Sequence, residues 1–227
     1  MKKKVKSSFI VTGLLGLMFA LFTVVVTTVD VRSIGPEGSE VGLATLNELV
    51  FQKLGVRMIW YTITDWLGVV ALLTAFCFAT AGLIQLVNRK SLFQVDIRIV
   101  LLGIYYVMVI AAYVFFEMFI INYRPVILEE NVGLEASYPS SHTMLVICIM
   151  GAAIVLFQQM IQKKVIRVIL NVLSGAVIVV TVFGRMISGV HWFTDIVGGV
   201  LLGAAFIMLY VSVVLLVQWK KENCSQQ

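Results

Sequence analysis

Six long apolar stretches constrain this chain more than any other feature of its sequence. They cover residues 10–29, 60–87, 99–121, 143–161, 168–183 and 193–217, and short polar segments separate them. A helix of about 20 apolar residues crosses the hydrocarbon core of a bilayer, where the backbone must satisfy its own hydrogen bonds. We therefore predict an all-α integral membrane protein, built as a bundle of six transmembrane helices.

The composition supports a membrane protein of one domain. Hydrophobic residues make up 60% of the 227 residues and charged residues only 13%, whereas soluble domains are roughly half apolar and one quarter charged. Six spans leave no room for a further soluble domain of ordinary size, so we expect a single domain over residues 1–227. Cys77 and Cys148 fall in apolar stretches and Cys224 in the polar tail, which argues against a disulfide framework.

The first stretch and the segment after it define the start of the bundle. The basic segment MKKKVKSSF resembles the start of a signal peptide, but the apolar run is long and ends without a small-residue cleavage site. We expect a retained first helix. After the breakers Gly35, Pro36 and Gly38, apolar residues recur at near-helical spacing over 41–50, which predicts a short interfacial helix.

Charged residues orient the predicted bundle. The basic residues of the N-terminus and of segments 89–98, 163–167 and 220–221 all fall on one side of six spans, while acidic segments fall on the other. By the positive-inside rule both termini are cytoplasmic, and the short polar motifs face outward at the cell membrane. The net charge of +5 follows from this topology, so we expect no nucleic-acid partner.

The chain contains two histidines, and each stands at the outer start of an apolar stretch. His142 follows the sequence YPSS, and His191 precedes Asp195 by four residues. A single interfacial histidine is often a bystander, and Asp195 alone is favourable in the first turn of a helix. On a helix, however, Asp195 shares a face with His191 and can accept a hydrogen bond from one ring nitrogen. That bond fixes the tautomer and makes the other nitrogen a base or nucleophile.

Two arginines and a helix start supply groups that bind phosphate. Arg124 and Arg185 lie near the same predicted membrane boundary, and the planar guanidinium matches phosphate oxygens. Taken singly, each arginine could instead extend toward lipid headgroups. Ser140 and Ser141 precede an apolar stretch, where the free amides of a helix N-terminus attract an anion. Alone, they would form an ordinary helix cap.

Together these residues predict phosphoryl transfer through a phosphohistidine. One histidine attacks phosphorus, the arginines and amides hold the equatorial oxygens, and the second histidine protonates the leaving oxygen. This chemistry requires no metal and no cofactor. A zinc site is the competing interpretation, but two histidines at the starts of separate helices lack a third ligand at metal spacing.

Three segments resemble the signature motifs of the type 2 phosphatidic acid phosphatase superfamily. They are YRP at 123–125, PSSH at 139–142 and GRMISGVHWFTD at 184–195. The family motifs are a lysine seven residues before Arg-Pro, then Pro-Ser-Gly-His, then Ser-Arg followed at fixed spacing by His and Asp. The third motif is the most specific, because the intervals of Arg185, His191 and Asp195 all agree. The resemblance extends over six helices with an outward-facing site.

The resemblance implies a role for each matching residue. His191 would be the nucleophile, Asp195 its orienting partner and His142 the general acid. Arg124, Arg185 and Ser140 would bind phosphate. The family is metal-independent and acts on lipid phosphates and diphosphates, including phosphatidic acid, phosphatidylglycerol phosphate and polyprenyl diphosphates such as undecaprenyl diphosphate. The expected partners are therefore a lipid phosphate and the bilayer, while the sequence leaves the oligomeric state open.

The chain departs from the family motifs at three positions. The family lysine is replaced by Glu117, the glycine of Pro-Ser-Gly-His by Ser141, and the serine of Ser-Arg by Gly184. Seven residues is close to two helical turns, so we expect Glu117 and Arg124 to share a helical face. Glu117 could pair with Arg124, become protonated, or face a cation on the substrate. Ser141 still offers its backbone amide.

Other interpretations remain open at this stage. Glu117 is compatible with a catalytically silent homologue that binds lipid headgroups or a membrane partner. A transporter is disfavoured because the charged motifs lie at helix ends rather than at mid-span. Asp65, between Trp60 and Trp66, either faces the site or lies in the aromatic belt of the membrane interface.

Overall fold

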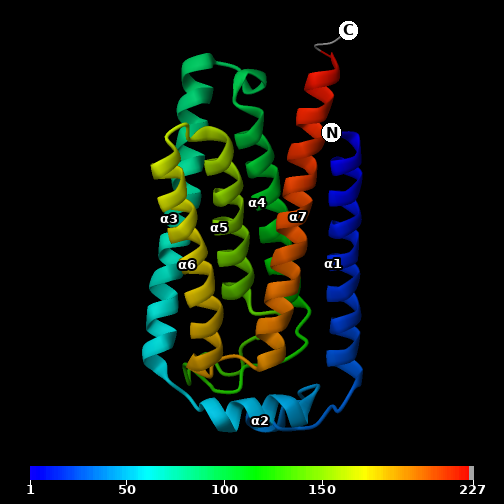
Figure 1. Cartoon of the computed structure of the whole chain (residues 1–227). Coiled ribbons are helices and arrows are strands. Elements are labelled where there is room, and N and C mark those ends of the chain that lie inside the picture. Colours follow the sequence, from blue (N-terminus) through cyan, green and yellow to red (C-terminus); the bar gives the residue numbers. More distant parts are fainter. Residues whose placement is uncertain (225–227) are drawn as a thin grey trace.

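Six long helices form the body of the protein, and a short helix lies across one end of the bundle (Figure 1). The structure is a computed structural model that describes residues 1–224. Within this range, six helices are long and apolar enough to cross a membrane, which confirms the predicted fold class. They are α1 (Lys2–Thr28), α3 (Met58–Arg89), α4 (Ile97–Met118), α5 (Ser141–Met160), α6 (Lys164–Ser188) and α7 (Phe193–Cys224).

The short helix α2 (Ala44–Leu54) confirms the prediction of a short helix after the first span. Its buried Asn47 fixes it to the start of α7, because Nδ2 donates to the Thr194 hydroxyl at 2.9 Å and Oδ1 accepts from the Thr194 amide at 3.1 Å. One polar side chain thereby joins the crossing helix to the bundle. Two single turns of 3-10 helix complete the elements, η1 (Pro36–Gly38) and η2 (Leu92–Gln94).

Most helices extend beyond the apolar stretches, because lysine, arginine and glutamine also favour helix. Helix α4 falls furthest short of its predicted end, at Met118 rather than residue 121. Tyr123 instead forms an antiparallel bridge with Ala136, and Pro125 disfavours helical geometry at the residue before it. Arg124 therefore lies beyond the helix. The prediction that Glu117 and Arg124 share a helical face is wrong.

Helix α5 lies at the centre of the bundle and contacts α3, α6 and α7. The main core cluster draws on three helices: Leu102, Tyr105 and Val109 of α4, Met144, Cys148, Ala152 and Leu156 of α5, and Tyr210 and Val214 of α7. Helix α1 packs along α7, where Thr12 and Ser212 hydroxyls lie 3.1 Å apart. All three cysteines are free.

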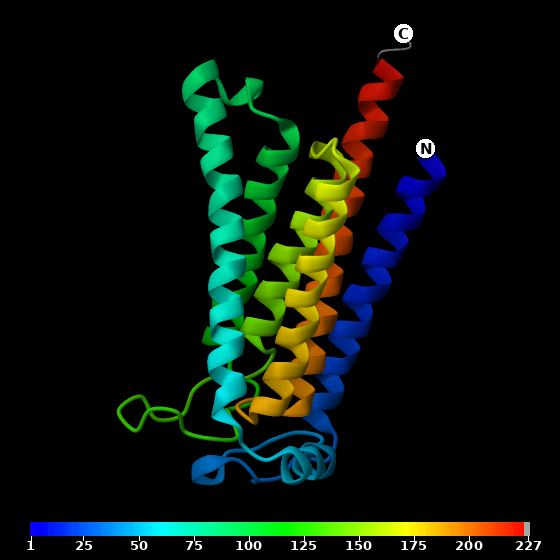
Figure 2. The ribbon, with the colours of Figure 1, turned by 60° about the vertical axis from the view of Figure 1, so that its left-hand side comes forward.

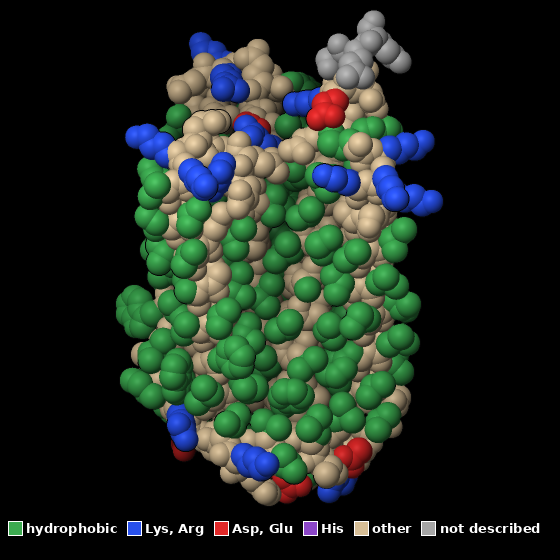
Figure 3. Space-filling view, viewed as in Figure 1, with side chains coloured by type: hydrophobic (Ala, Val, Ile, Leu, Met, Phe, Trp, Pro, Cys, Tyr) green, Lys and Arg blue, Asp and Glu red, His purple; other side chains and the backbone are tan. Residues whose placement is uncertain are grey.

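The outer surface of the bundle carries a broad apolar band (Figure 3). Lysine and arginine side chains gather at the end that holds both termini, and charges of both signs lie at the opposite end (Figures 1 and 3). That opposite end, called here the α2 end, also holds the loop of residues 119–140 between α4 and α5 (Figure 2). The apolar band is what a protein surrounded by lipid requires.

Candidate active site

The predicted site residues lie at the α2 end, on three chain segments that the fold brings together. His191 lies in the short connection between α6 and α7, which the sequence can form because Gly189 adopts a left-handed backbone conformation with φ of 71°. A side chain at Gly189 would also collide with the chain, since its Cβ would lie 2.3 Å from the Gly55 carbonyl oxygen. Glycine thus permits the tight turn that places His191 at the site.

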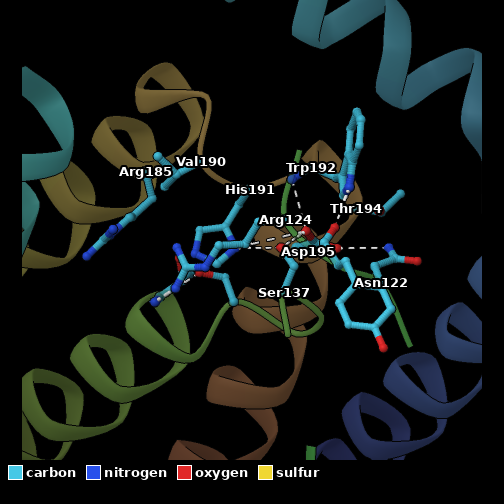
Figure 4. Close-up of polar contacts among 12 residues, drawn as sticks. Asn122, Arg124, Ser137, Arg185, Val190, His191, Trp192, Thr194 and Asp195 are labelled. Atoms are coloured by element: carbon cyan, nitrogen blue, oxygen red, sulfur yellow. Dashed lines mark hydrogen bonds and ion pairs between the residues drawn. The ribbon is translucent and has the colours of Figure 1, made fainter. Parts of the chain in front are cut away.

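The hydroxyl of Ser137 lies between the side chains of His191 and Asp195 (Figure 4). The His191 Nδ1 atom is 3.9 Å from Asp195 Oδ2, too far for the direct hydrogen bond that we predicted. Ser137 Oγ instead lies 2.9 Å from Nδ1 and donates to Asp195 Oδ2 at 2.5 Å. The two side chains lie near each other, but His191 precedes α7 rather than sharing a helical face with Asp195, and the Ser137 hydroxyl fills the gap.

This arrangement fixes the tautomer of His191. The Ser137 hydroxyl has one hydrogen, which it gives to the carboxylate, so its oxygen must accept from His191 Nδ1–H. The lone pair of neutral His191 is therefore on Nε2. Burial holds the pKa of His191 well below its ordinary value, and the charges of Arg124, Arg185 and His142 act in the same direction. At neutral pH the ring is uncharged and Nε2 is nucleophilic.

Asp195 is fully buried and accepts two further hydrogen bonds (Figure 4). They come from Asn122 Nδ2 at 3.0 Å and from the Trp192 backbone amide at 2.9 Å. Asn122 and Ser137 are neighbours across the 119–140 loop, because the Ser137 amide donates to the Asn122 carbonyl at 2.8 Å. Sequence reasoning missed both residues. Their only sequence signal is that each is a polar residue just before a motif, in NYRP and in SYPSSH.

Arg185 lies in the last turn of α6 with only 2% of its surface exposed. Its Nη2 binds Asp65 Oδ1, and the guanidinium carbon lies 4.8 Å from the centre of the Tyr61 ring. Its Nε is buried without a hydrogen-bond partner among residues 1–224. Asp65 thus faces the site, which resolves the alternative that the sequence left open.

Arg124 projects from the 119–140 loop and pairs with Glu135, with Nε 3.2 Å from Oε2. The backbones of the two residues are also joined, because the Arg124 amide donates to the Glu135 carbonyl at 3.0 Å. Within the described chain, Arg124 Nη1 is buried and makes no hydrogen bond. Each arginine therefore has a buried N–H without a partner, which is unfavourable. An anion bound at the site can accept a hydrogen bond from it.

The start of α5 supplies His142 and the first free helix amides. The Ser140 hydroxyl caps the helix, accepting from the Thr143 amide at 3.4 Å and donating to the Thr143 hydroxyl at 3.0 Å. The Ser140 amide donates to the Asp195 carbonyl at 2.9 Å. Both of its donors are therefore engaged within the protein. Ser141 and His142 begin the helix, and the first amides of a helix have no partner inside it.

Glu117 and Gly184, two of the departures from the family motifs, lie in different surroundings. Glu117 lies in the last turn of α4 and lines a narrow pocket beside Ser137 and Ser141. A Cβ atom at Gly184 would lie 2.5 Å from the Thr64 side chain, so close packing of α6 on α3 favours glycine there. Glu117 is thus placed beside the site, while Gly184 belongs to a helix contact.

An apolar groove leads from the site along α3 and α5. Asp65 and His142 lie at its polar end, and its volume is about 280 Å³. The remaining lining residues are Gly68, Val69, Ala71, Leu72, Leu145, Val146 and Ile149. The site therefore combines cationic donors with an adjoining hydrocarbon surface.

The zinc alternative requires a set of metal ligands. Residues 1–224 contain no group of three His, Cys, Asp or Glu side chains placed to hold a metal ion.

Comparison with known proteins identifies the family and the fold of this chain. The PAP2 superfamily matches residues 98–219, more than half of the chain. A crystal structure of a transmembrane PAP2 type phosphatidylglycerolphosphate phosphatase from Bacillus subtilis has the same fold, with a TM-score of 0.57 and 15% sequence identity. The similarity covers 91% of this chain and 96% of that protein. No curated protein sequence gives a significant match. The chain belongs to the PAP2 superfamily, as a multi-pass membrane protein.

Proposed function

We propose that this protein removes phosphate from a membrane lipid phosphate or diphosphate through a phosphohistidine intermediate on His191. The observation that carries the proposal is the Ser137 bridge, because it leaves the lone pair of a buried, neutral His191 on Nε2. The nearby arginines each have an unpartnered buried donor within residues 1–224. A nucleophile and an anion-binding surface thus meet in one place.

The proposed reaction has two steps. First, His191 Nε2 attacks phosphorus, the phosphorus–oxygen bond to the lipid breaks, and His142 gives a proton to the leaving oxygen. Arg124, Arg185 and the first amides of α5 stabilise the charge on the equatorial oxygens. In the second step water attacks phosphorus, the bond between phosphorus and His191 Nε2 breaks, His142 accepts the proton of that water, and inorganic phosphate leaves. Asp195 stabilises the positive ring through the hydroxyl that lies between them.

We further propose that the substrate enters from the outer leaflet, with the site facing outward and both termini cytoplasmic. The charge distribution at the two ends supports this orientation (Figure 3). The apolar groove between α3 and α5 fits an acyl or prenyl chain of phosphatidic acid, phosphatidylglycerol phosphate or a polyprenyl diphosphate.

The activity is tested by phosphate release from a panel of these lipids in detergent with EDTA present. We expect release from at least one lipid, because the proposed chemistry uses only protein side chains and water. Strict dependence on an added divalent metal would show that the mechanism is wrong.

Filling the apolar groove should weaken the binding of lipid chains. Leu72 lines the groove on α3, so Leu72→Trp is expected to raise KM for a long-chain lipid phosphate by roughly tenfold, since several buried methylenes lose their contacts. The KM for a short-chain analogue should change little. Leu73→Trp is the matched control, because Leu73 is similarly exposed, 58% against 60%, and lies outside the groove lining. Equal effects of the two substitutions would place the lipid chain elsewhere.

A catalytically silent homologue is the second candidate, and Glu117 favours it because a carboxylate occupies the position of the family lysine. Glu117→Lys distinguishes the two functions. If Glu117 belongs to a working site, turnover falls by roughly tenfold or more, since a new cation disturbs the charges beside Ser137. A large gain in turnover would instead indicate a degenerate site. Glu130→Lys, on an exposed part of the 119–140 loop, controls for the change in net charge.

A further inference from the structure

One face of α3 contacts Arg185 and His142. Tyr61 and Asp65 are four residues apart and share this face. Asp65 Oδ1 accepts from Arg185 Nη2, and the Tyr61 ring lies under the same guanidinium. Helix α3 lies outside the region matched by the superfamily, residues 98–219. The site thus includes a wall that the motifs do not describe.

The same face of α3 also holds the ring of His142. The His142 Nε2 atom lies 3.1 Å from the Thr64 carbonyl oxygen. A Cβ atom at Gly68 would lie 2.4 Å from Nε2 and 2.9 Å from Cε1, so the ring packs directly against the α3 backbone at this glycine. A carbonyl oxygen can only accept, so Nε2 carries a hydrogen. The Nδ1 atom of His142 is therefore the one that gives up or takes a proton.

Asp65 lies close to the same nitrogen. Its Oδ1 is 3.8 Å from His142 Nε2, while Arg185 from α6, Arg124 from the 119–140 loop and His191 from the α6–α7 connection place positive or titratable groups around the ring. The arginines that suit phosphate oppose a positive charge on His142. A carboxylate beside Nε2 offsets that repulsion.

We propose that Asp65 is a positioning residue that supports the protonated form of His142 from the side of α3; this inference rests on the proposed function. In the first step His142 Nδ1–H transfers its proton to the leaving oxygen as the phosphorus–oxygen bond breaks. The ring becomes neutral and keeps its Nε2 hydrogen on the Thr64 carbonyl. Asp65 itself neither gives nor takes a proton in this step. In the second step Nδ1 recovers a proton from the attacking water.

The test compares two leaving groups in Asp65→Asn, which keeps the shape of the side chain and removes its charge. A short-chain phosphatidic acid has an alkoxide leaving group that needs a proton, whereas 4-nitrophenyl phosphate does not. We expect kcat/KM to fall roughly 10- to 100-fold on the alkyl substrate, because part of the contribution of general acid catalysis is lost. On the aryl substrate it should fall by about threefold or less. The alkaline limb of the pH profile on phosphatidic acid should move to lower pH.

Two reference variants identify the step that is affected. His142→Ala should show the same dependence on leaving group, whereas Arg185→Ala should lose activity on both substrates. Equal losses on the two substrates in Asp65→Asn, or no loss, would overturn the inference while leaving the proposed function intact. Failure of the wild type to release phosphate from any lipid of the panel would overturn the proposed function, and the inference with it.

A second substitution tests the same contact without changing charge. Gly68→Ala favours helix but brings Cβ against His142, and it should reproduce the leaving-group dependence of His142→Ala at reduced size. Gly175→Ala on α6 is the matched control, because a Cβ there meets no atom within 4 Å. Thermal unfolding in detergent should be similar for both glycine variants. Wild-type kinetics in Gly68→Ala would count against the proposed role of α3.

Discussion

Replacing His191 by alanine is expected to lower kcat for phosphate release by roughly 10⁴-fold or more, the scale of losing a nucleophile whose partners act as one unit. The reason is specific to Nε2. Ser137 and Asp195 hold a proton on Nδ1, so no other atom of the site is prepared to attack phosphorus. The measurement is phosphate release from a lipid phosphate by the wild type and His191→Ala side by side.

Trapping the intermediate makes the His191 experiment sharper. Wild type quenched during turnover of a ³²P-labelled lipid should carry a label that is stable to base and labile to acid, as a phosphohistidine is. His191→Ala should carry no label. His142→Ala should still become labelled by an aryl phosphate, since that leaving group needs no proton. Label or activity that survives in His191→Ala would assign the nucleophile to another residue.

Breaking the bridge between His191 and Asp195 should have the next largest effect. Asp195→Asn places an amide among three donors, from Asn122, Ser137 and the Trp192 backbone. The amide nitrogen cannot accept, so one donor loses its partner and the tautomer of His191 is no longer fixed. We expect kcat to fall by roughly 10²- to 10⁴-fold, the range seen when the orienting aspartate of a catalytic triad is changed.

Ser137→Ala tests whether the hydroxyl carries this effect. With Ser137 removed, His191 Nδ1 and Asp195 Oδ2 remain 3.9 Å apart, and we expect about a 100-fold loss in kcat because the ring is no longer oriented. Ser212→Ala is the matched control, since Ser212 is a fully buried serine farther along α7. Full activity in Ser137→Ala would mean that Asp195 reaches His191 directly during turnover.

The membrane fold could be predicted from the sequence because lipid imposes one strong requirement on every span. Apolar stretches of sufficient length had to form helices, and all six did. The end of α4 could not be placed as well, because the bridge between Tyr123 and Ala136 joins residues from opposite ends of a loop. Hydropathy along the chain contains no information about that pairing.

The site could be predicted only as far as local spacing allowed. Spacing correctly indicated that Asp195 would lie near His191, but it could not reveal that His191 would precede the helix or that a hydroxyl from the 119–140 loop would enter between them. Asp65 was ambiguous for a similar reason. Its direction depends on the rotation of α3 about its axis, which is set by the packing of Thr64 against Gly184 and of Gly68 against His142. Tertiary packing determines both features.

The pairing of each arginine with a carboxylate bears on how the product departs. Arg124 is matched by Glu135 and Arg185 by Asp65, so in the proposed reaction phosphate must displace an internal carboxylate to bind either guanidinium fully. The reverse exchange occurs when inorganic phosphate leaves, because each arginine then regains its carboxylate and no buried cation is left uncompensated. These resident anions therefore disfavour retention of the product, and the empty site is ready for the next lipid.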